Sequence, residues 1–215
     1  DGLRRMFQEQ EDVYYYITVM NEKYSQPAMP AGAEAGILSG LYPVREALAK
    51  GPRVQLLGSG AILREVLAAA EMLEQDFGIA ADVWSVTSYS ELAREGEAAL
   101  RWNLLHPEDE PRRSHVERQF ARRQGPVIAA SDYVRAWPEQ IRGLLKRSYT
   151  VLGTDGFGRS DSRDRLRQYF EVDRNYVCVA ALSALAQEGG LDRSRVSEAI
   201  HKYGIDASKP NPRWI

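Results

Sequence analysis

The chain is poor in cysteine, because Cys178 is the only one among its 215 residues. A single cysteine excludes an internal disulfide framework and any zinc site built from several cysteines. It also fits a reducing compartment, so we expect a cytoplasmic protein. No apolar run approaches the roughly 20 residues that a membrane helix needs, and no secretory leader is recognisable.

The sequence also lacks an excess of charge of either sign. Its 28 Lys and Arg residues against 30 Asp and Glu residues give a formal net charge of -2. Such a balance provides no global basic field, so we expect neither a nucleic acid nor a membrane among the partners. The 44% apolar content is that of an ordinary soluble chain with one good core. The chain begins at Asp1 without a methionine, which suggests a piece of a longer polypeptide.

The N-terminal residues differ from the rest of the chain. Residues 13–20 read Val-Tyr-Tyr-Tyr-Ile-Thr-Val-Met, a composition typical of a buried strand, but nothing nearby completes a sheet. Residues 26–40 contain two prolines and three glycines, which is linker composition. We therefore place a domain boundary near Pro30. Residues 1–30 are expected to be the tail strand of a preceding domain plus a linker, and residues 31–215 an α/β domain.

Residues 54–86 predict a strand, a helix and a second strand. Residues 54–57 form the first strand, the turn Gly58-Ser59-Gly60 follows it, and residues 82–86 form the second. Gly78 stands where a left-handed residue would end the helix. Such a unit has parallel strands and a right-handed connection. The apolar stripe of the helix consists of Ile62, Val66, Ala70, Leu73 and Phe77.

The same alternation continues toward the C-terminus. It predicts strands over residues 126–131 and 149–152, and a surface loop over residues 106–115. The sum is an α/β fold: a three-layer, doubly wound, mostly parallel sheet with a helical end. The remaining helices are expected after a capping box at Ser88 and Glu91, over residues 116–123 and 139–146, after a cap at Ser160 or Asp161, over residues 176–186, and from Asp192 to Gly204.

The turn Gly58-Ser59-Gly60 resembles part of a dinucleotide-binding fingerprint. It follows a strand and opens a helix, where a pyrophosphate would meet exposed backbone N–H groups. The third glycine of the fingerprint is missing, because position 63 is leucine. An independent nucleotide-binding module therefore stays the alternative hypothesis.

Residues 153–163 form the densest unusual stretch, Gly-Thr-Asp-Gly-Phe-Gly-Arg-Ser-Asp-Ser-Arg. A P-loop needs a lysine that is absent, and a calcium loop needs a ligand where Phe157 stands. Asp155-Gly156 with Asn175 imitates a thiamine-diphosphate motif, but Thr154 replaces its first glycine.

The simplest interpretation of this loop is a rigid turn at the carboxyl edge of the sheet, with Arg159 and Arg163 paired to Asp161 and Asp164. The edge position also suits an interface, and Phe157 between glycines could fill a neighbour's pocket. We therefore predict an interface or channel-edge loop made by Asp155, Phe157, Gly158, Arg159, Ser160, Asp161 and Arg163.

The remaining reactive side chains form no recognisable catalytic set. His106, His115 and His201 have no metal-ligand spacing and are expected at the surface. Cys178 lies in an apolar segment and is expected in the core. We therefore name no catalytic, cofactor-binding or metal-binding residue.

Several longer blocks resemble one family, the homodimeric bacterial decarboxylating component of pyruvate dehydrogenase, over its C-terminal part. The resemblance runs from the first residue to Arg213. The blocks are Asp12-Val-Tyr-Tyr-Tyr-Ile-Thr18, Asn21-Glu22, Pro27-Ala-Met-Pro30 with Gly32, Val54-Gln-Leu-Leu-Gly-Ser-Gly60, Leu63-Arg64, Arg101-Trp102-Asn103, Leu105-His106-Pro107 and Val151 to Arg163.

This resemblance implies a transketolase-like C-terminal domain of an enzyme that oxidatively decarboxylates pyruvate and acetylates lipoyl groups. It implies thiamine diphosphate and magnesium in the full-length enzyme, held between the first and middle domains, and none bound by this fragment. It also implies three partners: the remaining domains of the same polypeptide, a second subunit of a homodimer, and the dihydrolipoyl acetyltransferase component. No catalytic label maps onto the residues of this chain.

Overall fold

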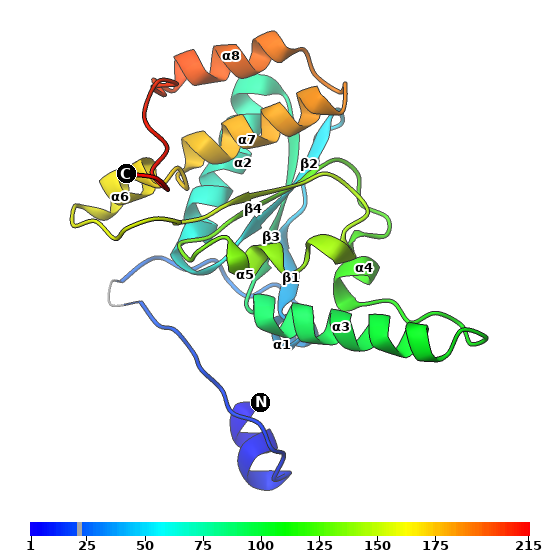
Figure 1. Cartoon of the computed structure of the whole chain (residues 1–215). Helices are drawn as coiled ribbons and strands as arrows, with labels where there is room; N and C mark the ends of the chain where they lie inside the picture. The colour runs from blue at the N-terminus through cyan, green and yellow to red at the C-terminus, as the bar shows by residue number, and fades with distance from the viewer. Residues whose placement is uncertain (21–22) are drawn as a thin grey trace.

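A five-stranded sheet forms the centre of the computed structural model, which describes residues 1–20 and 23–215 (Figure 1). The strand order is β1-β3-β2-β4-β5, with β1 antiparallel to β3 and the other neighbours parallel. The mostly parallel sheet of the prediction is thereby confirmed. The strands are β1 (Leu41–Arg45), β2 (Arg53–Gly58), β3 (Ala80–Val86), β4 (Val127–Ala130) and β5 (Tyr149–Leu152).

Helices cover both faces of this sheet. One apolar core lies between the sheet and α2, α7 and α8, and a second lies between the opposite face and α3 and α4. These three layers are the predicted doubly wound architecture. The α-helices are α1 (Glu34–Leu38), α2 (Leu63–Phe77), α3 (Tyr89–Leu105), α4 (His115–Phe120), α5 (Ala136–Glu139), α6 (Arg163–Tyr169), α7 (Arg174–Gln187) and α8 (Arg193–Lys202). Short helical turns lie at Arg4–Gln8, Gly60–Ile62 and Arg142–Leu144.

The predicted strand-helix-strand unit is present as β2, α2 and β3. The apolar stripe of α2 is buried, and Leu73 at its centre has no exposed surface. Gly78 ends the helix with φ +68°, a left-handed conformation that glycine adopts without a steric penalty. Asp192 caps α8 as predicted, because its carboxylate accepts a hydrogen bond from the Ser194 N–H group at 2.7 Å.

Some local predictions were wrong. Strand β1 was not predicted, because Pro43 interrupts its pattern, and a proline is tolerated there only because β1 lies at the sheet edge. Residues 139–146 form no continuous helix. Ser88 does cap α3, but the Glu91 carboxylate pairs with Arg94 at 2.7 Å instead of completing a capping box. The N-cap of α6 is Ser162, later than expected.

The predicted strand over residues 13–20 does not form within this chain. Figure 1 shows the segment running away from the sheet, and no strand lies beside it among the described residues. Most of its aromatic and β-branched side chains are exposed, with Tyr16 and Val19 at 87% each. The segment thus has the composition of a buried strand but lacks the sheet that would bury it. Asn21 and Glu22 lie outside the described residues.

Candidate functional site at the carboxyl edge of the sheet

The connections of the sheet diverge at the carboxyl ends of β2 and β4. From β2 the chain crosses through α2 to β3 on one side, and it later returns to β4 on the other side of β2. Gly58 and Ala130 are paired at the ends of these strands, and just beyond them the Ser59 hydroxyl donates to Ser131 Oγ at 2.9 Å. In open α/β sheets, ligands bind in the crevice outside such a point.

A pocket of about 330 Å³ lies at this edge. It falls at the lower end of the size range of small-molecule sites. The residues after β2, β4 and β5 form one part of it, and α6 forms the other. Its lining consists of Ala61, Asp132, Thr154, Gly156, Gly158, Arg159, Arg163, Leu166, Arg167, Phe170 and Val172. We call it the carboxyl-edge pocket.

The start of the predicted interface loop is fixed by Asp155. Its carboxylate accepts the backbone N–H of Arg135 at 2.9 Å and faces the guanidinium groups of Arg135 at 3.8 Å and Arg213 at 4.0 Å. Asp155 is thus already compensated by positive charge, so Asp155-Gly156 does not fit the magnesium ligands of a thiamine-diphosphate motif. The first part of the loop therefore connects the start of α5 to the C-terminal tail through the contacts of Asp155.

Gly156 makes the close approach of this tail possible. Its φ is +107°, and a Cβ atom at this position would lie 2.5 Å from the Pro212 carbonyl oxygen. Lys209 fastens the same tail to α6, because its ammonium group donates to the Tyr169 carbonyl at 2.7 Å. Figure 1 shows the C-terminus beside α6. The loop, α6 and the tail therefore form one connected edge.

Residues 157–161 of the predicted interface loop are exposed. Phe157 is 77% exposed, and Gly158, Ser160 and Asp161 also face solvent. Arg159 donates to the Tyr169 hydroxyl at 3.2 Å rather than pairing with Asp161.

Two carboxylates of the predicted pairing lie near the start of α6: Asp161 precedes the helix and Asp164 is in its first turn. Asp164 pairs with Arg167 at 3.6 Å, one helical turn further on, and Asp161 accepts the Ser162 N–H group at 2.7 Å. The predicted acid–arginine pairing was therefore wrong for Arg159, which contacts the Tyr169 hydroxyl instead.

A buried carboxylate ties α6 to α2 and α7. Glu65 on α2 is 5% exposed, accepts from Arg174 at 2.9 Å and 3.1 Å, and lies 3.4 Å from Arg167. Burial alone would raise the pKa of Glu65, but the hydrogen bonds and charge of Arg174, together with the charge of Arg167, lower it. Glu65 therefore stays ionised and acts as a structural link.

Asp132 is the one carboxylate in the lining of the carboxyl-edge pocket. Its side chain is exposed at the pocket mouth, yet the surrounding protein removes enough water to raise its pKa, against the lowering effect of Arg167 and Arg163. Its backbone carbonyl accepts the Thr154 hydroxyl at 2.7 Å.

The Gly58-Ser59-Gly60 turn has a packing explanation. A Cβ atom on Gly58 would lie 2.7 Å from the Leu63 Cα atom, so glycine is required there for α2 to start close to β2. Gly60 has φ +53° and begins a short 3-10 turn before the helix. These glycines are accounted for without a pyrophosphate.

The surface position predicted for one of the three histidines was wrong. His115 is 7% exposed, and its Nε2 atom lies 2.8 Å from the Leu41 carbonyl oxygen. The surface expectation failed because Ser114, with Glu117, forms a capping box that starts α4 at His115 and turns it inward. His106 and His201 are exposed as expected.

Cys178 is fully buried, as predicted. Burial raises the pKa of its thiol to about 12, so the thiolate that a nucleophile requires is not populated near neutral pH. Among the described residues, no group of three or more His, Cys, Asp and Glu side chains could hold a metal ion. In the same residues, no helix is long and apolar enough to cross a membrane.

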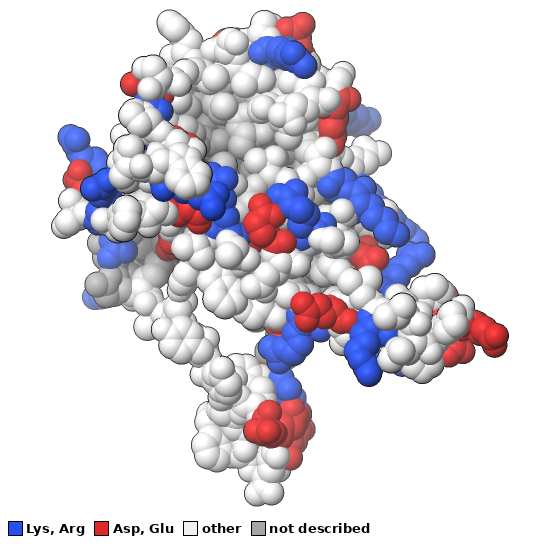
Figure 2. Space-filling view, in the orientation of Figure 1, with Lys and Arg blue, Asp and Glu red and all other residues white. Residues whose placement is uncertain are grey.

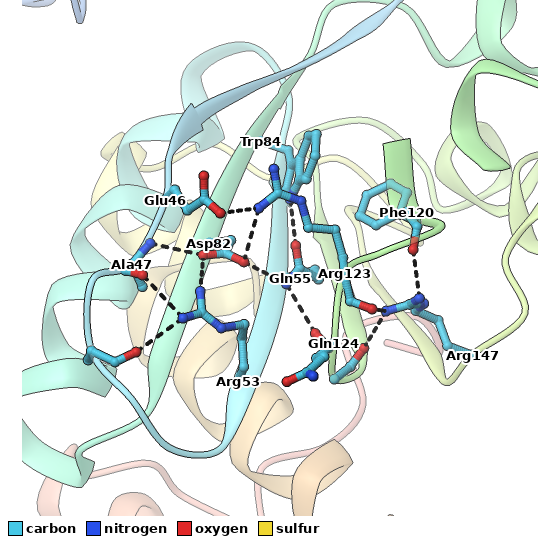
Figure 3. A network of polar contacts seen from close by, with 12 residues as sticks. Glu46, Ala47, Arg53, Gln55, Asp82, Trp84, Phe120, Arg123, Gln124 and Arg147 are labelled. Carbon is cyan, nitrogen blue, oxygen red and sulfur yellow. Dashed lines mark hydrogen bonds and ion pairs between the residues drawn. The ribbon is translucent and has the colours of Figure 1, made fainter. Parts of the chain in front are cut away.

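A second polar cluster, which the sequence analysis missed, lies in β2 and β3 nearer their amino ends (Figure 3). Asp82 is 2% exposed and accepts from the Ala47 N–H at 2.9 Å, Arg53 at 2.5 Å and Gln55 at 2.8 Å. The Trp84 indole donates to Gln55 Oε1 at 2.9 Å. Because these buried groups satisfy one another, the cluster is structural. The sequence signal that could have revealed this cluster is the presence of polar residues inside two otherwise apolar strands.

Comparison with family models gives the class of protein, the C-terminal domains of transketolase-like enzymes. Residues 40–173 match the family model described as the transketolase-like TK C-terminal domain, and the chain belongs to this family. Residues 1–27 match a second model, the pyruvate dehydrogenase E1 component middle domain.

Comparison with individual proteins gives a narrower result than the family model. The chain is 58% identical over its whole length to the pyruvate dehydrogenase E1 component of Cupriavidus necator and 52% identical over 99% of its length to that of Escherichia coli. It covers 24% of each, so it spans about a quarter of these relatives and matches their C-terminal part. A transketolase structure from Campylobacter jejuni is 20% identical, with a TM-score of 0.48 over 74% of this chain and 20% of that one. These comparisons do not support the independent nucleotide-binding module.

Proposed function

We propose that this chain is a non-catalytic, C-terminal part of a pyruvate dehydrogenase E1 component. The observation that carries the proposal is the 58% identity to such a component over the whole chain, which corresponds to 24% of that relative. The intact enzyme would oxidatively decarboxylate pyruvate in the cytoplasm and pass the acetyl group to lipoyl groups. Its partners would be the rest of the polypeptide, a second subunit and the acetyltransferase component.

The non-catalytic role is supported by how the reactive side chains are used. Glu65 and Asp155 are compensated by arginines, His115 supports β1, and Cys178 is a buried thiol. When bound by the intact enzyme, thiamine diphosphate with magnesium supplies the carbanion chemistry. The residues of this chain would instead stabilise the domain that packs against the cofactor-binding part.

We propose a domain boundary near Pro30, with residues 1–30 belonging to the preceding domain and residues 31–215 forming the α/β domain. Support comes from the separate matches at residues 1–27 and 40–173. It also comes from the exposure of Tyr14, Tyr16 and Val19, which are side chains of a strand without its sheet.

Removing residues 1–20 is expected to change the free energy of unfolding by less than about 0.5 kcal/mol, because none of their side chains is buried. Urea denaturation of the two forms measures this difference. Removal of residues 209–215 is the control that should lower stability, because Lys209 joins the tail to α6. A loss of several kcal/mol on removing residues 1–20 would contradict the proposed boundary.

We propose that the exposed interface loop, formed by Asp155, Phe157, Gly158, Arg159, Ser160, Asp161 and Arg163, packs against another domain or subunit near the active-site channel. Support comes from Phe157, a large apolar side chain that is 77% exposed. The contacts of Asp155 and the close packing at Gly156 fix the start of the loop. Little backbone conformational entropy would therefore be lost when a partner buries Phe157.

Titration of thiamine diphosphate with magnesium into the 215-residue chain is expected to give no saturable heat of binding. The reason is that Asp155, the carboxylate of the thiamine-like Asp155-Gly156 pair, already faces the guanidinium groups of Arg135 and Arg213. Isothermal calorimetry measures this, with NAD(H) and ATP titrated in parallel. Saturable binding of thiamine diphosphate at micromolar concentration would show that the chain contributes to the cofactor site and would overturn the non-catalytic role.

A further inference from the structure

We propose that a second pocket, formed by α4 and the residues just before β5, binds a short aliphatic dicarboxylate. Its volume is about 270 Å³. We call it the amino-edge pocket. The proposal does not depend on the function of the intact enzyme, since it concerns a site formed by residues of this domain alone.

The pocket lies at the amino edge of the sheet. One wall comes from α4, where Glu117, Phe120 and Ala121 share one face because they are three and four residues apart. The other wall consists of residues 144–147, which precede β5. The exposed interface loop follows β5 at the opposite edge, so the pocket lies away from the surface that we assign to another domain or subunit.

Arg147 supplies a fixed positive charge to this pocket (Figure 3). Its Nη1 atom donates to the Arg123 and Gly125 carbonyls at 2.9 Å and 3.2 Å, and its Nη2 atom donates to the Phe120 carbonyl at 2.8 Å. These carbonyls orient the guanidinium but carry no net charge. Among the described residues Arg147 forms no ion pair, and burial lowers its pKa despite the more distant charge of Glu188. An anion in the pocket would stabilise this half-buried cation.

The unused edge of the Arg147 guanidinium favours a carboxylate. Its three hydrogen bonds involve only Nη1 and Nη2, so the Nε–H group has no partner among the described residues, and Nη2 keeps a second N–H. Two N–H groups on neighbouring nitrogens of a guanidinium bind both oxygens of one carboxylate. Arg147 therefore presents a site for one carboxylate group.

Two further cations of the lining make room for a second carboxylate. Arg113 and Lys146 are exposed and form no ion pair within the described part of the chain. Glu117 is the one carboxylate that the described residues place in the lining, and its Oε2 atom accepts the Ser114 N–H and hydroxyl at 2.8 Å and 2.9 Å. Three cations against one carboxylate leave two positive charges, which a dicarboxylate would match.

Neighbouring charges outside the lining do not cancel this excess. Arg118 pairs with Glu95 at 3.3 Å, and Arg123 pairs with Glu46 at 2.5 Å. Arg122 is exposed and adds a further positive charge beside the pocket. Figure 2 shows Lys and Arg side chains gathered over the region of α4, although the chain as a whole is nearly neutral.

The apolar part of the lining describes the body of the ligand. Phe120, Leu144 and Leu145 line the pocket and offer no hydrogen-bonding side-chain groups. The segment between the two carboxylates is therefore hydrocarbon. A volume of about 270 Å³ lies just below the usual range of small-molecule sites, so this segment is short. Glutarate combines these features.

Calorimetric titration of the 215-residue chain with glutarate tests the proposal. We expect saturable binding with a dissociation constant of about 1 mM or below. Butyrate, which has a single carboxylate, is expected to bind about tenfold more weakly. Absence of saturable glutarate binding, or equal affinity for butyrate, would overturn the proposal.

Two double variants with the same change in net charge show whether the binding lies in this pocket. Arg113→Gln with Lys146→Gln removes two cations of the lining and should weaken glutarate by about tenfold or more. Arg193→Gln with Lys50→Gln is the control, since both residues are exposed and lie outside the lining. Its affinity should stay within about twofold of the unmodified chain, because salt screens distant surface charges. Equal losses in the two double variants would contradict a site in the pocket.

Arg147→Lys tests the guanidinium itself. Lysine keeps the positive charge but lacks the planar pair of N–H groups, so we expect glutarate binding to weaken by about tenfold. Circular dichroism checks that the variant folds, because Arg147 also binds three backbone carbonyls. Unchanged affinity in the folded variant would contradict the assigned role of Arg147. If the variant does not fold, the two double variants decide.

Parallel titrations distinguish a small dicarboxylate from other anions. Tetraglutamate with blocked ends is expected to bind more weakly than glutarate, because the pocket is compact. Tighter binding of tetraglutamate would overturn the proposal and assign the pocket to an acidic protein segment. Inorganic phosphate that binds as tightly as glutarate would contradict the preference for carboxylates.

Discussion

Replacing Asp82 by alanine is expected to lower the free energy of unfolding by about 3 kcal/mol, because breaking a buried ion pair leaves an uncompensated charge. Asp82 is 2% exposed and receives hydrogen bonds from Arg53, Gln55 and the Ala47 backbone. Arg53 keeps some contact with water, at 22% side-chain exposure, which places the expected loss at the low end for such pairs. Urea denaturation followed by circular dichroism measures it.

Glu46→Gln is the matched control for the Asp82 prediction. Glu46 pairs with Arg123 in the same cluster at 2.5 Å, but its side chain is 65% exposed. An exposed pair contributes about 1 kcal/mol or less, so the control should change stability little. Equal losses from Asp82→Ala and Glu46→Gln would contradict the assignment of Asp82 as the centre of a buried structural cluster.

Leu182→Ala is expected to lower the free energy of unfolding by about 2–5 kcal/mol, since it removes a fully buried side chain and leaves a cavity. Leu182 lies on α7 and belongs to the core between this helix, α2 and the sheet. The variant should unfold at a lower urea concentration with an unchanged dependence on urea.

Leu104→Ala makes the same chemical change on another helix, where the side chain is 77% exposed. Its effect should stay within about 0.5 kcal/mol, as for most surface substitutions. A loss of less than about 1 kcal/mol for Leu182→Ala would mean that α7 is not held by its apolar core as described.

Local sequence patterns correctly predicted those elements whose structure depends on one short segment of the chain. The spacing of apolar residues defined α2, and Gly78 marked its end, because both depend on neighbours within a few turns. Strand β1 was not predicted, because its partner β3 lies about 40 residues further along the chain. Pro43 also interrupts the alternation of residues that is typical of a strand. The prediction for residues 13–20 failed for the opposite reason, since their composition fits a strand but no strand lies beside them among the described residues.

The location of the glycine-rich loop after β5 could be predicted from the sequence, but its contacts could not. The glycine-rich loop was expected at the carboxyl edge, and the structure places the pocket beside it. The partners of Asp155 could not be predicted, because Arg213 is 58 positions away along the chain. The link from Glu65 to Arg174 spans an even longer separation. Such contacts depend on tertiary packing rather than on local sequence.

The most direct test of the account is a chimera in which this chain replaces the corresponding C-terminal part of the Cupriavidus necator pyruvate dehydrogenase E1 component. Pyruvate-dependent release of carbon dioxide, with thiamine diphosphate and magnesium, is measured on the purified dimer. The account predicts activity within a few fold of the unmodified component, and a weaker dimer or lower activity when Phe157→Ser is added. A folded, dimeric chimera without activity would contradict the proposal that this chain is the C-terminal part of such an enzyme.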